Sequence, residues 1–220
     1  MFRGKMLKKI LSLICMLVSV QSWAQTVNEI RPMGDYATIN VRKDMEIMEL
    51  LSNDKVSKKE KLVVVQEIEE NAGDFNPAVL ASLSCYYLSN KDLKKGAFWA
   101  RAALFRTIVD VKIHYDPSIE GISRMFYRGI AETGNKVIKT KAEQAKFISE
   151  LKFAGAKIID WDKRTPRNYD DRWVCLHSTK AFIETEIKNV SQEEKQKIID
   201  KEYSILAEVC KSEADLYPGL

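Results

Sequence analysis

The sequence predicts an all-α fold, a compact array of about eight helices in antiparallel hairpins, and three observations lead to that prediction. Apolar residues recur at steps of three and four along most of the chain, whereas the alternation typical of half-buried strands is nearly absent. Helix start signals recur at intervals that leave only short connections. Proline, which interrupts helices, occurs only five times in 220 residues.

The N-terminus has the three parts of a secretory signal peptide. Its positively charged segment contains four basic residues, namely Arg3, Lys5, Lys8 and Lys9. An apolar segment over residues 10–20 follows, and Ser22 and Ala24 are the small residues expected before a cleavage site at Gln25. This apolar segment is shorter than the roughly 20 residues of a membrane-spanning helix. We therefore expect residues 1–24 to be removed and residues 25–220 to form a single helical domain, periplasmic or extracellular.

Removal of the signal peptide changes the charge of the chain. The full sequence has 35 basic and 31 acidic residues, a net charge of +4. Because the first 24 residues hold four of the basic residues and no acidic one, the mature chain has 31 of each and is neutral. A neutral chain does not attract nucleic acid or an anionic membrane as a whole. We expect no nucleic-acid partner and no membrane span after cleavage.

The first three helices of the mature chain are marked by their ends. A helix is expected over about residues 42–52. Ser57 and Glu60 form a capping box that begins a second helix, which ends near Gly73. Asn76 and Pro77 begin a third helix, which runs to about Ser89, because asparagine caps a helix and proline suits its first turn.

The helix expected over about residues 92–114 has the strongest apolar pattern. Its stripe consists of Leu93, Ala97, Ala100, Leu104, Ile108 and Val111. Phe98, Phe105 and Val109 widen this stripe, so the helix is expected to pack on two sides, near the centre of the domain.

The second half of the chain predicts four more helices. Asp116 and Pro117 begin a helix expected to end at Gly134, and residues 134–140 are either a loop or a short helix. A capping box at Thr140 begins a helix that ends before Pro166. The last two helices are expected over about residues 170–183 and, from a third capping box at Ser191, to about Ala214.

Residues 77–110 resemble one tetratricopeptide unit. Tyr87 and Leu83 fall on the tyrosine and leucine of that repeat, and three small residues, Ser84, Gly96 and Ala103, occupy positions that the repeat keeps small. The sequence departs from the pattern where Leu80, Ala100 and Ile108 replace a tryptophan, a large aromatic residue and a proline. No second copy follows at that spacing. The resemblance implies a helical hairpin of this shape and, if more units were present, a groove for peptides or proteins.

Three cysteines, Cys85, Cys175 and Cys210, remain after cleavage, and they are too widely spaced to indicate a disulfide framework. An oxidising compartment allows one bridge and one remaining thiol, and buried unpaired cysteines fit the sequence equally well. His177 follows Cys175 by two residues, which on a helix places them on different faces. No zinc-ligand spacing or catalytic motif is present, so we expect no metal and no cofactor.

One segment concentrates residue types that are common in binding sites. Residues 160–173 contain six candidate partner-binding residues, namely Trp161, Arg164, Arg167, Tyr169, Arg172 and Trp173. A structural role for the same residues is the alternative. The sequence therefore favours an exported, non-catalytic domain that binds another protein or a peptide. A periplasmic immunity protein against a delivered toxin is one specific version. A cell-envelope hydrolase, using scattered carboxylates or Cys175 with His177, is the competing class.

Overall fold

The protein is all-α, as the sequence predicts. The computed structural model describes residue 32 and residues 34–216, so the expected signal peptide lies outside the described residues. Within this part of the chain there are seven α-helices, four short 3-10 helices and no strand. The α-helices are α2 (Arg42–Ser52), α3 (Lys58–Glu70), α4 (Pro77–Ser89), α5 (Leu93–Ile113), α6 (Ile122–Val137), α7 (Lys141–Arg164) and α8 (Gln192–Leu216). The 3-10 helices are η1 (Gly34–Thr38), η2 (Pro117–Ile119), η3 (Asp171–His177) and η4 (Thr179–Phe182). None of these helices is long and apolar enough to cross a membrane.

The helix starts follow the predicted capping chemistry. The side chains of Ser57 and Thr140 each accept a hydrogen bond from the backbone N–H three residues on. Their own backbone N–H groups each donate to the side chain of the glutamate at that position. Ser191 forms the same reciprocal pair with Glu194 at the start of α8. The Asn76 side chain accepts from two backbone N–H groups of α4. Each cap satisfies donors that the first turn of a helix leaves without partners.

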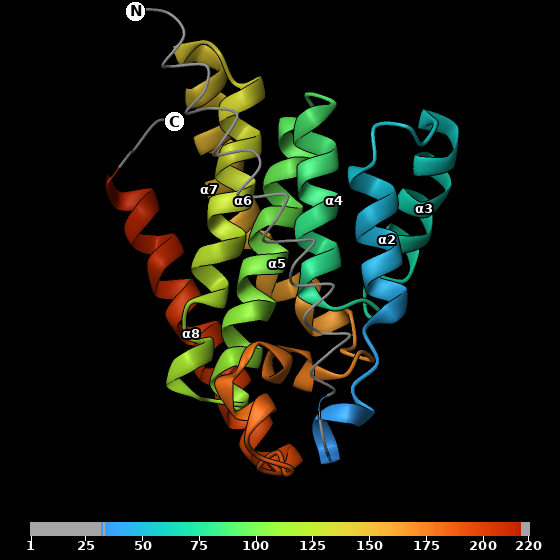
Figure 1. The fold of residues 1–220 in the computed structure, drawn as a ribbon. Helices are drawn as coiled ribbons and strands as arrows, with labels where there is room; N and C mark the ends of the chain where they lie inside the picture. Colours follow the sequence, from blue (N-terminus) through green and yellow to red (C-terminus); the bar gives the residue numbers. More distant parts are fainter. Residues whose placement is uncertain (1–31, 33, 217–220) are drawn as a thin grey trace, which may run out of the picture.

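Helix α5 lies at the centre of the fold, as its wide apolar stripe predicts. It packs against α4, α6, α7, α8 and η3 (Figure 1). The main core, which surrounds α5, includes Phe75, Leu80, Leu83, Val109 and Ile158, each at most 1% exposed. A second, smaller core lies under the 3-10 helices and includes Tyr36, Ile119 and Trp173.

The hairpin of α4 and α5 is closely packed where the tetratricopeptide resemblance expects small residues. The Ser84 hydroxyl donates to the carbonyl oxygen of Gly96 at 2.7 Å. A β-carbon on Gly96 would lie 2.6 Å from the Leu88 side chain, which is closer than van der Waals contact allows. The two helix backbones approach each other here because neither residue carries a bulky side chain.

Two predicted helices differ from the structure. The helix expected from Pro117 to Gly134 is a 3-10 turn followed by α6, which continues past Gly134 to Val137. Val137 packs on the core, and this burial outweighs the cost of glycine inside a helix, about 1 kcal/mol. The helix expected over residues 170–183 consists of η3 and η4 instead, because Ser178 caps a new turn by accepting from the Lys180 N–H.

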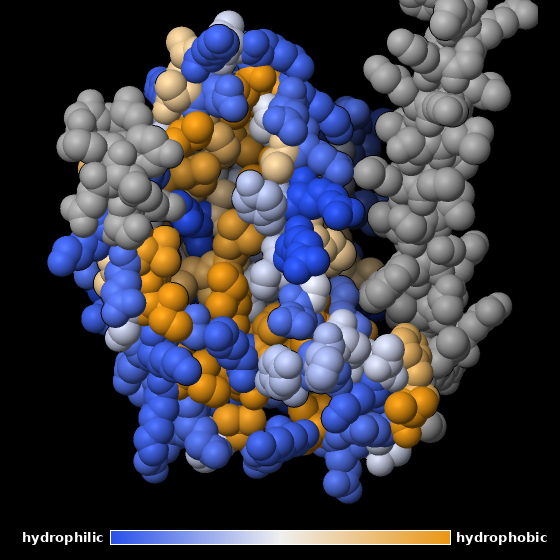
Figure 2. Space-filling view, turned by 90° about the vertical axis from the view of Figure 1, so that its left-hand side faces the viewer, coloured by the Kyte–Doolittle hydropathy of each residue, from blue (hydrophilic) through white to orange (hydrophobic). Residues whose placement is uncertain are grey.

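Part of the predicted α5 stripe is not buried. Ile108 is 36% exposed and Leu104 is only partly buried. Helix α6 packs on α4 and α5, whereas α8 packs on α5 and α7, so this side of α5 is left between α6 and α8. Figure 2 shows the corresponding face of the molecule, where apolar residues form a strip with hydrophilic margins.

Candidate functional site

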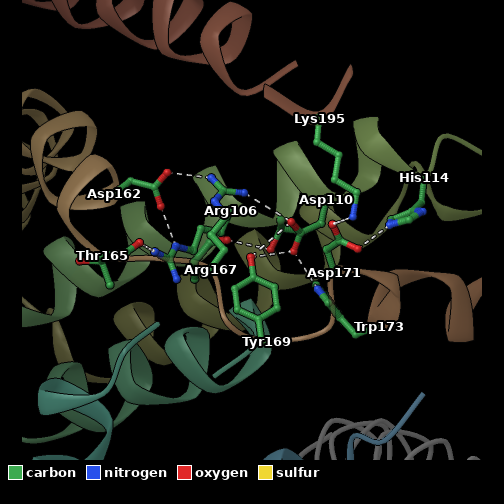
Figure 3. A network of polar contacts seen from close by, with 12 residues as sticks. Arg106, Asp110, His114, Asp162, Thr165, Arg167, Tyr169, Asp171, Trp173 and Lys195 are labelled. Carbon is green, nitrogen blue, oxygen red and sulfur yellow. Dashed lines mark hydrogen bonds and ion pairs between the residues drawn. The ribbon is translucent and has the colours of Figure 1, made fainter. Parts of the chain in front are cut away.

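A buried network of ionic and polar side chains joins α5 to the segment after α7 (Figure 3). Its first centre is Arg106 of α5, which is fully buried. The Arg106 guanidinium donates to Asp162 at 2.7 Å and to the carbonyl oxygens of Thr165 at 2.7 Å and Ala72 at 3.3 Å. It also lies 4.5 Å from the centre of the Trp161 ring, a cation–π arrangement. A buried arginine is tolerated here because its charge and most of its donors have partners.

Asp162, near the end of α7, connects three elements. Besides Arg106, it accepts from Arg167 at 2.8 Å and from the Tyr203 hydroxyl of α8 at 2.8 Å. Burial by itself would raise the pKa of Asp162, but the two guanidinium groups outweigh burial and lower it. The carboxylate is therefore charged, and it ties α7 to α5, to α8 and to the loop that follows α7.

Asp110, one turn after Arg106, is the second centre. Its carboxylate accepts from the indole N–H of Trp173 at 2.8 Å and from the Tyr169 hydroxyl at 3.0 Å, and Arg167 lies at 3.4 Å. Burial raises the pKa of Asp110 to about 7, even though the Arg167 charge and the Trp173 and Tyr169 hydrogen bonds favour the charged form.

A third group extends the network toward α8. His114, at the end of α5, contacts Asp171 at 2.8 Å through Nε2, and the Lys195 ammonium contacts the other oxygen of Asp171. Burial alone would raise the pKa of Asp171, but hydrogen bonds with His114 and Lys195 outweigh it and lower the pKa. The Nδ1 atom of His114 is buried and has no hydrogen-bond partner among the described residues.

A cleft of about 610 Å³ lies beside this network. The end of α5 and the segment 167–172 form one wall, and residues 187–190 with the first turns of α8 form the other. Both signs of charge line it. The acidic residues are Asp35, Asp110, Asp170 and Asp171, and the basic residues are His114, Arg167, Arg172, Lys188 and Lys195. A second cleft of about 950 Å³ shares His114 and residues 187–190.

The structure brings three of the six predicted binding residues to this cleft, namely Arg167, Tyr169 and Arg172. The Arg172 side chain is 34% exposed, compared with 15% for Arg167, and it contacts Asp170 at 2.7 Å. Arg167 and Tyr169 face the cleft from within the buried network. The cleft wall is thus built from residues whose positions the network fixes.

The other three predicted residues lie elsewhere. Trp173 is 3% exposed and stacks on Phe126, so its surface is used inside the second core. Trp161 packs edge-on against Phe98 and its ring lies under Arg106. Arg164 is exposed and donates to the Asp160 carbonyl, outside the residues that line the cleft.

Sequence reasoning missed the α5 members of the network. Arg106, Asp110 and His114 are not among the six residues that the sequence predicts for a binding site. The spacing of Arg106 and Asp110 gave no signal of a site, because they are four residues apart and share the helix face opposite the predicted apolar stripe, where charged residues are ordinarily exposed to solvent. Only their burial in the fold shows that they need partners.

The remaining candidates from the sequence are the three cysteines and His177. No disulfide links Cys85, Cys175 and Cys210 within the described part of the chain. Burial, together with nearby carboxylates, raises the pKa of Cys175 to about 12, so it is a thiol and not a nucleophilic thiolate at neutral pH. Burial also lowers the pKa of His177, whose ring packs edge-on against Trp173. Among the described residues, no group of three or more histidine, cysteine or carboxylate side chains is arranged to hold a metal ion.

No protein-family model, curated protein sequence or solved structure matches the chain. The resemblance of residues 77–110 to a tetratricopeptide unit therefore stays a prediction. What defines this protein so far is a helical domain with a central helix, a buried ionic network and an adjoining cleft of mixed charge.

Proposed function

We propose that this chain is an exported, non-catalytic domain that binds another protein or a peptide at the cleft of about 610 Å³ beside η3. The observation that carries the proposal is the meeting of Arg167, Tyr169 and Arg172 at one open cleft, held in place by the buried network. Arginine and tyrosine are enriched among residues that dominate binding energy. Side chains that are already ordered lose little conformational entropy when a partner binds.

The charges of the cleft support a partner that presents both signs. Arg172 is paired with Asp170, and Lys195 is paired with Asp171. This pairing leaves Lys188 and Asp35 as the positive and negative groups of the lining that form no ion pair within the described part of the chain. A peptide segment with acidic and basic side chains matches this lining better than a purely anionic or cationic ligand.

The chemistry of the cleft favours binding over catalysis. Asp110 has the pKa nearest to that of a general acid, but it is fully buried and occupied by Trp173 and Tyr169. Asp171 is occupied by His114 and Lys195. The pairing of Cys175 with His177 is disfavoured by the high pKa of the thiol.

A capture experiment with two matched arginine variants tests the proposal. The purified protein is used to capture partners from envelope extract, which are identified by mass spectrometry, and each partner is then prepared and its affinity measured. Arg172→Ala changes the cleft, whereas Arg164→Ala changes an arginine of the same segment that does not line it. We expect Arg172→Ala to weaken binding of the true partner about tenfold and Arg164→Ala to leave it unchanged.

The outcomes separate the candidate functions. A stoichiometric partner that Arg172→Ala does not affect would refute the cleft as the site. A partner that is itself a toxin would identify the immunity-protein version. Absence of any partner together with activity against muropeptides would overturn the proposal in favour of the hydrolase.

A further inference from the structure

A second surface, separate from the cleft, exposes apolar side chains along the central helix. Leu104 and Ile108 of α5 belong to the predicted core stripe, yet Ile108 is 36% exposed. On α8, Ile205 and Val209 are 40% and 42% exposed. Figure 2 shows an apolar strip on this side of the molecule. We refer to the surface over Leu104, Ile108, Ile205 and Val209 as the α5 groove.

One wall of the α5 groove is fixed by an ion pair. Lys112 of α5 contacts Glu202 of α8 at 3.1 Å. Lys112 is one turn after Ile108, and Ile205 is about one turn after Glu202, so each apolar residue shares a helix face with a member of the pair. The exposed side chains of α5 and α8 are therefore neighbours across this contact.

Helix α6 forms the opposite wall. Burial raises the pKa of the Cys85 thiol of α4, and Thr133 of α6, which lies beside this thiol, opposes that shift, so the edge of α6 that carries Thr133 faces α4. Tyr127 lies on the other edge of the helix, toward the α5 groove, and is 63% exposed. Arg124 and then Arg128 come next around the helix beyond Tyr127, Arg124 nearer the groove and Arg128 farther from it, and both are exposed. The groove therefore has an apolar floor and a basic margin on the α6 side.

We propose that the α5 groove binds an amphipathic helix of a partner protein, with its apolar face on Ile108 and Ile205 and acidic side chains toward Arg124 and Arg128. An amphipathic helix in a groove between two helices is a recurrent mode of recognition, and the groove runs along α5 with a helix on either side. Charge complementarity favours an acidic helix over a second copy of this chain. A two-fold pair would bring two copies of the basic margin into one interface, which their mutual repulsion disfavours.

Two synthetic peptides and three variants test this inference. The first peptide is a labelled amphipathic helix with leucines at i, i+3, i+4 and i+7 and glutamates beside them, and the second has lysines in place of the glutamates. Fluorescence anisotropy at low salt measures their binding to the purified protein. Ile108→Glu places a charge on the floor, and the double variant Arg124→Glu/Arg128→Glu reverses the margin. Val63→Glu is the control, because Val63 on α3 is also exposed, at 60%.

The glutamate peptide is expected to bind at least about tenfold more tightly than the lysine peptide, and the margin variant is expected to reverse that preference. Ile108→Glu should weaken binding about tenfold, whereas Val63→Glu and the cleft variant Arg172→Ala should not. Equal binding of both peptides, no binding of either, or no effect of Ile108→Glu would each overturn the inference. So would a dimer in sedimentation that Ile108→Glu dissociates, because a second copy would then occupy the groove.

Discussion

Replacement of Arg106 by leucine is the most direct test of the buried network. The substitution keeps an aliphatic side chain in the core but removes three hydrogen bonds, the charge partner of Asp162 and the contact with the Trp161 ring. Asp162 would keep Arg167 and Tyr203, which reduces the penalty of leaving its charge buried. The carbonyl oxygens of Ala72 and Thr165 would lose the donor that Arg106 provides.

The magnitude follows from these separate losses. Breaking a buried ion pair by removing one partner costs about 3–5 kcal/mol, and we take the lower end because Arg167 remains. A buried carbonyl left without a donor costs about 1 kcal/mol or more. We therefore expect Arg106→Leu to lower the free energy of unfolding by about 4 kcal/mol. Arg106→Lys keeps the charge but loses the planar guanidinium group with its several donors, so we expect the free energy of unfolding to fall by about 2 kcal/mol.

Urea unfolding followed by circular dichroism measures these changes. Arg164→Ala is the control, because this exposed arginine lies in the same region, and its effect is expected to stay within about 0.5 kcal/mol. A loss of less than about 1 kcal/mol for Arg106→Leu would refute the idea that the network holds this end of the fold together.

Two further predictions concern packing and pH. Gly96→Ala should destabilise the protein by about 1–3 kcal/mol, because the new β-carbon would lie 2.6 Å from Leu88; Gly129→Ala, where nothing lies within 4 Å, is the control, and equal stability of the two variants in urea would contradict the close approach. The raised pKa of Asp110, about 7, means that the folded state holds this proton more tightly than the unfolded state. Its contribution to stability is complete below about pH 4 and is lost as pH rises to about 7, so the wild type should lose stability relative to Asp110→Asn between about pH 4 and 7 and change little above that range. A difference between the two unfolding free energies that does not change with pH would contradict that assignment.

Local sequence signals predict most of the helix boundaries. The capping boxes at Ser57, Thr140 and Ser191 and the Asn76–Pro77 start are interactions between residues at most four apart, so their chemistry can be read without knowing the fold. The boundaries that differ depend on distant contacts. Nothing near Gly134 in the chain indicates that Val137 packs on the core and lets the helix continue.

The candidate site was only partly predictable for a related reason. Residue types alone drew attention to Arg167, Tyr169 and Arg172, which do line the cleft. The same types drew attention to Trp173, but a tryptophan is equally suited to a core, and its burial depends on Asp110 and Phe126. Type preferences do not distinguish an exposed anchor from a buried one, because both uses exploit the same large apolar surface.

The spacing of the network along the chain bears on when the fold can be completed. Arg106 and Asp162 are 56 residues apart, and Asp110 and Trp173 are 63 residues apart. Tyr203, a further partner of Asp162, comes another 41 residues later. The centre of the domain can therefore close only after nearly the whole chain has been released from the ribosome.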